Sequence, residues 1–257
     1  MDQSERRIYL INELIKENRE FRKAGIPSNV EDQKTFLRGL MNIRMPSEIS
    51  EDFLKIQDKY LQQETEAKGI TCLSDLNPIR KGIYLWQGDI TTLRCGAIVN
   101  AANSGMTGCY VPCHGCIDNA IHTYAGIQLR MKCNEIMEEQ GYPEPEGGAK
   151  ITPAYNLPCD YIIHTVGPIV RGEPTKLDED ILASCYNSCL ELAEKNGIKS
   201  IAFCCISTGE FHFPNERAAQ IAVEAVNKYR KTTKSEIEVI FDVWKEKDLE
   251  IYRKLLG

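Results

Sequence analysis

One stretch of the chain concentrates the side chains best suited to chemistry. Three cysteines and two histidines fall within residues 109–122, and a helical pattern begins inside that stretch. Zinc in proteins takes tetrahedral Cys and His ligands. The spacing Cys-x4-His-x-Cys offers three ligands, Cys109, His114 and Cys116, from a tight turn around Gly115. Three protein ligands with an open fourth position are typical of a catalytic metal site rather than a closed structural one.

Two other interpretations of this turn remain open from spacing alone. The segment is also compatible with a loop of free thiols, or with a cysteine nucleophile paired with His114 or His122. Cys113 directly precedes His114, so its side chain is expected to point away from the proposed ligands. His122 stands alone beside apolar residues, and we expect a packed core histidine there.

Polar residues at helix starts and strand ends form further candidate groups. Asp118 and Asn119 open the helical pattern, where an acid either caps the helix or holds a water or a ribose hydroxyl. Asp89 follows a strand pattern and either accepts from an exocyclic amine or caps its turn. Asn103 ends the next strand-like segment, where small neighbours let a ligand approach the backbone.

A glycine-containing loop, residues 207–214, connects a buried strand pattern to a helix. Backbone N–H groups of such a loop can point at a phosphate. The loop contains neither GK[ST] nor GxGxxG, so it is a weak signal by itself. Phe211 and Phe213 within it are either core residues or stack on a sugar or base.

Composition limits the classes of protein to consider. The chain has 257 residues, of which 42% are hydrophobic and 26% charged, as in soluble globular proteins. The net charge of -6 gives no basic field, so nucleic-acid binding is not expected. The N-terminal segment lacks an apolar signal region, and no run of about 18 apolar residues occurs. We expect a cytoplasmic monomer without a membrane partner.

The eleven cysteines are expected to be reduced thiols, because no export signal is visible. Six of them lie in apolar strand-like or helical contexts, where a thiol packs as a small hydrophobe. These six are Cys95, Cys159, Cys185, Cys189, Cys204 and Cys205.

Hydrophobic periodicity divides the chain in two. The helices it predicts at the N-terminus cover residues 1–24, 30–44 and about 47–68. From residue 71 strands alternate with helices. We therefore place a boundary between an all-helical N-terminal extension, residues 1–70, and an α/β domain, residues 71–257.

The α/β part is expected to form a largely parallel sheet covered on both faces. The predicted strands cover residues 73–76, 82–90, 95–103, 149–156, 160–168, 200–207 and 236–244. The predicted helices cover residues 117–139, 177–197, 215–231 and 247–256. Ligands of such folds bind beyond the C-terminal strand ends, and the polar loop candidates fall at those ends. This agreement supports one common site.

Five motifs in one order resemble the macrodomain, the ADP-ribose-binding α/β fold. They are QGDIT at 87–91, AIVNAAN at 97–103, DNAIH at 118–122, IIHTVGP at 162–168, and ISTG with FP at 206–209 and 213–214. The resemblance covers about residues 71–257. It implies a three-layer α/β/α sandwich with a mixed, mostly parallel sheet, preceded by the small helical segment.

The resemblance also implies roles for individual residues. Asp89 would hydrogen-bond the adenine amine, with Ile90 beside it. Asn103 would contact the distal ribose, and Asp118 sits where hydrolytic macrodomains carry a catalytic aspartate, so these two are the catalytic candidates. The other implied ADP-ribose contacts are Cys116, Ile117 and, around the diphosphate, Ser207, Thr208, Gly209, Glu210 and Phe211.

Two departures from common hydrolytic macrodomains stand out. CYVPCHGC replaces a glycine run before Asp118, and His212 stands where many members have glycine. The first departure is similar to the zinc-containing macrodomain subgroup of bacteria and fungi. That similarity implies Zn²⁺ held by Cys109, His114 and Cys116, next to the distal ribose. Members of the subgroup resemble partners of a sirtuin-like ADP-ribosyltransferase that modifies a lipoyl-carrier protein of the glycine-cleavage H type.

The expected activity is that of a zinc-dependent protein-ADP-ribose hydrolase of the glycosidase type, which removes ADP-ribose from Asp or Glu side chains. Three alternatives stay open from the sequence. The chain could read ADP-ribose without cleaving it, or hydrolyse O-acetyl-ADP-ribose or a related metabolite. In the third, the metal is purely structural and the helical extension carries the function.

Overall fold

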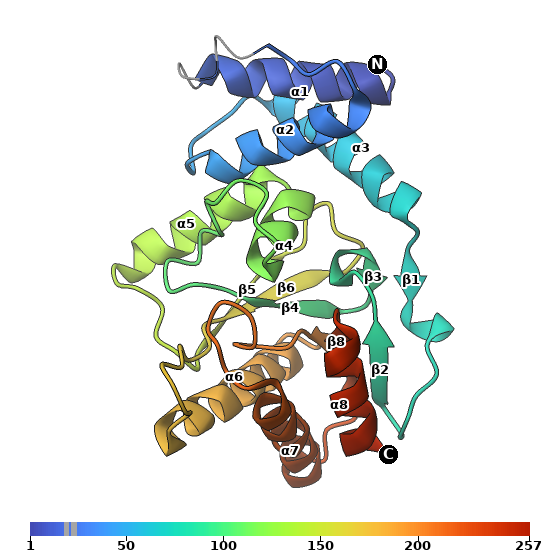
Figure 1. Ribbon diagram of the computed structural model, residues 1–257, viewed down its shortest axis with the longest axis vertical. Helices are drawn as coiled ribbons and strands as arrows, with labels where there is room; N and C mark the ends of the chain where they lie inside the picture. Colours follow the sequence, from blue (N-terminus) through green and yellow to red (C-terminus); the bar gives the residue numbers. More distant parts are fainter. Residues whose placement is uncertain (18–20, 22–24) are drawn as a thin grey trace.

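The computed structural model describes residues 1–17, 21 and 25–257. Its strands in the main sheet are β2 (Ile83–Gln87), β4 (Ala97–Ala101), β5 (Ala149–Pro153), β6 (Tyr161–Thr165), β7 (Ser200–Phe203) and β8 (Glu238–Val243). They form one six-stranded sheet in the order β2-β8-β7-β4-β6-β5. All neighbours are parallel except β5, which pairs antiparallel to β6. Figure 1 shows this sheet crossing the middle of the molecule.

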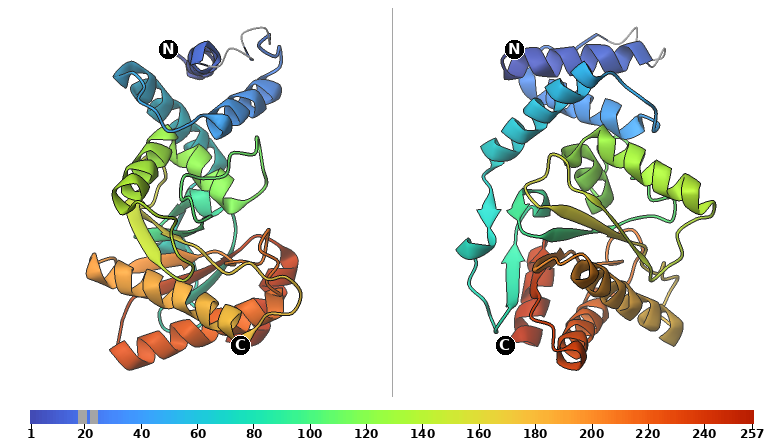
Figure 2. Two further views of the ribbon diagram at one scale, coloured as in Figure 1. Left: turned by 90° about the vertical axis from the view of Figure 1, so that its left-hand side faces the viewer. Right: turned by 180° about the vertical axis from the view of Figure 1, so that it is seen from behind.

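Helices cover both faces of the sheet. They are α4 (Ile117–Ala125), α5 (Ile127–Gln140), α6 (Lys176–Lys195), α7 (Asn215–Thr233) and α8 (Glu246–Leu256). The helices α6, α7 and α8 lie on one face and α4 and α5 on the other, as Figures 1 and 2 show. The expected α/β/α sandwich with a mixed, mostly parallel sheet is therefore confirmed. Within the described residues, no helix is long and apolar enough to cross a membrane.

Three further helices precede the sheet: α1 (Gln3–Glu17), α2 (Val30–Ile43) and α3 (Glu51–Lys68). Side-chain caps fix two of their starts, since Asn29 accepts from the backbone N–H of Asp32 and Ser50 from that of Phe53. The three helices stack over α4 and α5, away from the sheet (Figure 2). They share a hydrophobic cluster that also takes in Ile127 at the start of α5.

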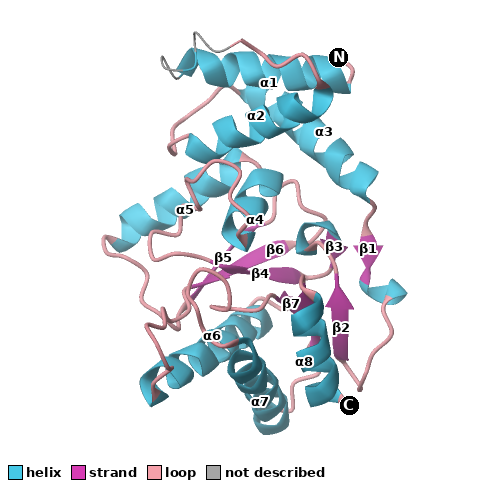
Figure 3. Cartoon of the chain, viewed as in Figure 1, coloured by secondary structure: helices cyan, strands magenta, loops and turns pink. Residues whose placement is uncertain are grey.

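The structure corrects the sequence-based elements at two places. The strand expected at 73–76 is a 3-10 helix, Leu73–Asp75, because Asp75 accepts the backbone N–H of Cys72 and turns the chain. Only β1 (Thr71–Cys72) before it is extended, and it pairs in parallel with β3 (Leu93–Arg94) beside the main sheet (Figure 3). The helix expected at 117–139 is two helices, since Gly126 has φ +98° between α4 and α5.

The first expected helix, residues 1–24, is described only in part. The described helix stops at Glu17, and residues 18–20 and 22–24 of the expected span lie outside the described residues. All eleven cysteines are free thiols, as expected. Cys205 is only partly buried, however, because it lies past the end of β7.

A buried glutamine connects the helical segment to α5. Gln57 of α3 is fully buried, and its side-chain oxygen accepts the backbone N–H of Ile127 at 3.0 Å. Gly126, the residue before α5, offers no side chain for this purpose. The Gln57 amide nitrogen donates to Gln128 at 2.7 Å. Gln57 therefore caps a helix that is distant in sequence.

We predict that Gln57→Ala lowers the free energy of unfolding by about 1–3 kcal/mol, because it leaves a buried N–H without an acceptor. Denaturant unfolding of the full chain measures the change. The control is Gln63→Ala on the exposed side of the same helix, which should stay within about 0.5 kcal/mol of the wild type. Equal losses in the two variants would contradict the capping role.

Candidate functional site

The C-terminal ends of the parallel strands open into one cleft of about 910 Å³. This size is typical of small-molecule sites. The cleft brings together every site residue predicted from the sequence. These are Asp89, Ile90, Asn103, Cys109, His114, Cys116, Ile117, Asp118, Ser207, Thr208, Gly209, Glu210 and Phe211. They come from loops after β2, β4 and β7 and from the start of α4, as the position of ligand sites in parallel sheets requires.

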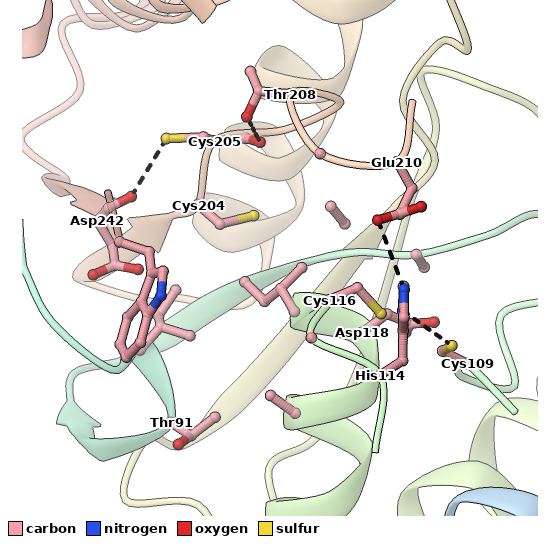
Figure 4. A pocket seen from close by; sticks show the side chains of 18 of the residues that line it. Thr91, Cys109, His114, Cys116, Asp118, Cys204, Cys205, Thr208, Glu210 and Asp242 are labelled. Carbon is pink, nitrogen blue, oxygen red and sulfur yellow. Dashed lines mark hydrogen bonds and ion pairs between the residues drawn. The ribbon is translucent and has the colours of Figure 1, made fainter. Parts of the chain in front are cut away.

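Residues 108–116, here named the Cys/His turn, form one end of the cleft. The ligand atoms of Cys109, His114 and Cys116 all lie within 4.8 Å of one another (Figure 4). The Cys109 Sγ to His114 Nδ1 distance is 3.6 Å, which is about the sulfur–nitrogen separation in a tetrahedral zinc site. The donor set and its spacing therefore fit a zinc ion.

Cys113 points out of this group, as expected. Its Sγ lies 3.3 Å from the backbone oxygen of Thr35 in α2. The residue has φ +53°, so the turn reverses there. This reversal directs the two flanking segments, with Cys109 on one and His114 and Cys116 on the other, toward the same point.

His114 also faces an acid from the opposite wall. Its Nε2 lies 3.7 Å from Oε1 of Glu210 (Figure 4). A carboxylate beside the second ring nitrogen is the usual outer partner of a metal-binding histidine, because it fixes the ring and its tautomer. Glu210 thus lies against the Cys/His turn, and its side chain is less suited to contact an anion than its backbone is.

Asp118 lies in the first turn of α4, beside the Cys/His turn. It is 5% exposed, and its two oxygens accept from Asn100 at 2.8 Å and Asn103 at 3.3 Å. Burial raises the pKa of Asp118 to about 6, against the opposing effects of these donors and of Arg130. The carboxylate is therefore mostly ionised at neutral pH and more basic than an ordinary aspartate.

Two core histidines lie behind Asp118. His122 is buried, as expected, and burial keeps its pKa well below the ordinary value, so its 3.6 Å approach to Asp118 is not an ion pair. Burial lowers the pKa of His164 to about 3. Its ring nitrogens lie 3.1 Å from Asn100 and 2.9 Å from Thr152. Asn100 thus links Asp118 to a neutral histidine and is fixed by both.

The other end of the cleft is built around Asp89. Its Oδ1 accepts from the backbone and hydroxyl of Thr91, and its Oδ2 lies 2.9 Å from Nζ of Lys68. Burial would raise the pKa of Asp89, but Thr91 and Lys68 together hold it below the ordinary value. Lys68 also stands 3.4 Å from the ring centre of Tyr124. The carboxylate is ionised and offers an acceptor to a ligand amine.

The loop after β7 provides donors between these two ends. No described residue accepts from the backbone N–H of Ser207, Gly209, Glu210 or Phe211. The Ser207 hydroxyl is buried and has no hydrogen-bond partner among the residues that the structure describes, and this residue has φ +63°. Unpaired N–H groups in such a concave loop favour an anion. A phosphate-type ligand between the two ends would satisfy them.

The same loop contains two phenylalanines and His212, whose positions the structure shows. Phe213 is 1% exposed and belongs to the core, whereas Phe211 lines the cleft. His212 has φ +57°, a conformation that glycine adopts most easily.

Several residues of the cleft lie outside the motifs that the sequence shows. Arg38 and Lys68 reach it from α2 and α3, and Asp242 and Trp244 from the end of β8. Burial holds the pKa of Asp242 well above its ordinary value, and its Oδ1 has no partner among the described residues. Trp244 could have been predicted, because it is an aromatic residue directly after the last strand pattern. No local pattern marked Arg38 or Lys68.

Comparisons with known proteins agree with this geometry. A family model described as "Macro domain" matches residues 99–222. The chain is 55% identical over 261 residues to a protein named protein-ADP-ribose hydrolase from Treponema medium, with both chains fully covered. It is 49% identical over 248 residues to a protein of the same name from Staphylococcus aureus, covering 96% of this chain and 93% of the other.

Solved structures show the same fold. The Oceanobacillus iheyensis macrodomain with ADP matches with a TM-score of 0.63 and 35% identity, covering 70% of this chain and 93% of the other. The Trypanosoma brucei macrodomain in complex with ADP-ribose matches with a TM-score of 0.66 and 29% identity, covering 86% and 95%. Both neighbours were therefore solved with an adenine nucleotide bound.

We predict that Gly167→Ala weakens ADP binding about tenfold or more. A Cβ at this position would lie 2.1 Å from the Ser207 hydroxyl, so it displaces the start of the donor loop. Loss of one or two hydrogen bonds to a charged ligand costs about 1.5–3 kcal/mol each. Calorimetric titration with ADP measures the change. Gly25→Ala, which has open space around it, is the control. Unchanged ADP affinity in Gly167→Ala would show that this loop does not bind the diphosphate.

Proposed function

The chain belongs to the macrodomain family, and we propose that it is a protein-ADP-ribose hydrolase that uses zinc. The observation that carries the proposal is the placement of Asp118 beside three metal-type donors at one end of the cleft. At the opposite end, Asp89 offers an acceptor suited to an adenine amine. Between the two ends, the loop after β7 offers N–H donors suited to a diphosphate. The name of the relatives from Treponema medium and Staphylococcus aureus supports the same activity.

Cys109, His114 and Cys116 would hold the zinc. Three protein ligands leave one coordination position, and zinc bound there would supply Lewis acidity toward a ribose oxygen or a water. The three donor side chains come from one short turn, and all of them line the cleft. We therefore propose that the metal takes part in the reaction rather than only stabilising the fold.

Asp118 is the proposed general base. It accepts a proton from a water that attacks the anomeric carbon of the distal ribose, while the bond from that carbon to the side-chain oxygen breaks. ADP-ribose and a free carboxylate leave. Burial raises the pKa of Asp118 to about 6, and a zinc ion beside it would lower that pKa, so the carboxylate is ionised at neutral pH and can accept the proton. Asn100 and Asn103 keep its two oxygens oriented.

Groups remote from the reacting bond would supply the binding energy. Asp89 accepts the adenine amine, and the N–H groups of residues 207–211 receive the diphosphate. Such contacts hold the ribose against Asp118 and lower the entropic part of the barrier. The net charge of -6 does not oppose this, because the anion meets backbone dipoles rather than a basic surface.

We further propose that the substrate linkage is an ester to Asp or Glu. A carboxylate is a good leaving group, so a water and one base suffice to cleave it. The resemblance of the Cys/His turn to zinc-containing macrodomains supports this choice. It also supports a lipoyl-carrier protein of the glycine-cleavage H type as substrate, modified by a sirtuin-like ADP-ribosyltransferase that the enzyme reverses.

Metal removal should abolish hydrolysis of a protein that carries ADP-ribose on aspartate or glutamate, and added zinc should restore it. The fold should persist, since the hydrophobic core of the domain lies elsewhere. Metal analysis, thermal unfolding and ADP-ribose release measure the three effects. Cys116→Ala should lose both zinc and activity, whereas Cys113→Ala, whose thiol faces α2, should keep them. Intact turnover after chelation and in Cys116→Ala would exclude the zinc mechanism.

Asp118→Asn should lower the rate of ADP-ribose release about 10²–10⁴-fold, because the amide cannot take the proton. Its affinity for free ADP-ribose should fall much less than the rate, since the side-chain volume is kept and the remaining amide oxygen still accepts from Asn100 or Asn103. Single-turnover assays and calorimetry separate the two effects. Asp180→Asn on the exposed side of α6 serves as the matched control. A rate within twofold of the wild type would remove Asp118 from the mechanism and favour a binding module.

A further inference from the structure

The Cys/His turn is held from outside by the helical segment. Arg38 of α2 donates through Nη2 to the backbone oxygen of His114 at 3.0 Å. It also donates to the side-chain oxygen of Asn119, from Nη2 at 2.7 Å and from Nε at 3.2 Å. One planar guanidinium therefore joins the metal-ligand segment to the first turn of α4. Both contacts use Nη2, and a lysine ammonium would end one bond short of that atom, so a lysine reaches neither acceptor as well.

Asn119 extends this connection across the turn. Its amide nitrogen donates to the backbone oxygen of Val111 at 3.0 Å, and its backbone N–H points at Cys116 Sγ at 3.4 Å. Asn119 is fully buried, so these bonds are shielded from water. Arg38 and Asn119 together thus connect the backbone at His114 to the backbone at Val111, on the other side of the turn.

A second contact from α2 supports the strained point of the turn. Asn42 is 1% exposed and accepts the backbone N–H of Cys113 at 2.9 Å. It donates to the Thr123 hydroxyl of α4 at 2.9 Å. Cys113 has φ +53°, a conformation that costs a non-glycine residue about 1 kcal/mol. A Cβ on Gly39 would lie only 3.8 Å from Cys113 Sγ, so α2 packs directly on the turn.

We propose that the N-terminal helices form the outer shell of the metal centre, with Arg38 and Asn42 as positioning residues for the Cys/His turn. The proposal rests on the proposed function in treating Cys109, His114 and Cys116 as zinc ligands. Neither positioning residue needs to touch the substrate. They act by holding the turn in the shape that brings its donors together. The helical segment is then part of the active site rather than an arm that recruits a partner.

The outer partners of metal ligands commonly change metal affinity by about 10–100-fold when they are removed. Arg38→Ala in the full chain should therefore release zinc about 10–100-fold faster to a chromogenic chelator, and it should lower kcat more than it raises KM. Arg6→Ala is the matched control, since Arg6 lies on α1 and its guanidinium donates to Gln3 and Gln63, neither of which belongs to the Cys/His turn. Arg38→Lys should retain most of the defect, because the shorter side chain ends one bond before the position of Nη2, the atom that donates to both His114 and Asn119.

Amide hydrogen exchange of the metal-free protein gives a readout that does not depend on zinc. Arg38→Ala should speed exchange in residues 111–119 relative to the wild type and to Arg6→Ala, with the same thermal unfolding midpoint within a few degrees. Wild-type zinc release and wild-type exchange in Arg38→Ala would overturn the inference, and so would full rescue by Arg38→Lys. A wild-type chain that binds no zinc would instead refute the proposed function, and the exchange data would still decide the role of Arg38.

Discussion

The site depends on one buried guanidinium. Arg130 of α5 is 5% exposed and donates to backbone oxygens on two sides. On one side it reaches Thr107 at 2.7 Å and Cys109 at 3.4 Å, at the start of the Cys/His turn. On the other it reaches Asn42 and Arg44 at the end of α2, both at 2.6 Å. A buried charge is tolerated only when such acceptors surround it. The same bonds therefore satisfy the charge and join the turn, α5 and the helical segment.

This arrangement explains how a loop with little buried side-chain surface can be rigid. The side chains of residues 109–116 are half-buried or exposed, so packing alone cannot fix the turn, and its backbone carbonyls need donors. Arg130 provides donors from α5, and Arg38 provides donors from α2. Asp118 follows directly, with its carboxylate held by Asn100 at 2.8 Å. The three Cys and His donors and the Asp118 carboxylate are thereby held in one frame, as the proposed reaction at a single ribose carbon requires.

The sequence predicted the α/β architecture and the motif residues of the cleft, because each motif follows a strand and parallel strands end at one edge. Asp89, Asn103 and Ser207 could be assigned to one site by that rule alone. The break at Gly126 escaped prediction, since apolar residues continue on both sides of it with helical spacing. The roles of Arg38 and Lys68 also escaped it. Periodicity shows which face of a helix is apolar, but not which loop its polar face will meet.

The contacts of Arg38 and Lys68 could not be predicted because they join residues that are far apart in the sequence. Arg38 contacts residues that lie 76 and 81 positions later, and Lys68 meets Asp89 across the junction between the helical segment and the sheet. These contacts form only after the helices have docked on α4, so the helical segment and the cleft should gain order together. A chain divided at the apparent boundary near residue 70 would keep every motif of the cleft. It would lose Arg38 and the cation beside Asp89, and the two ends of the cleft would each lack a support.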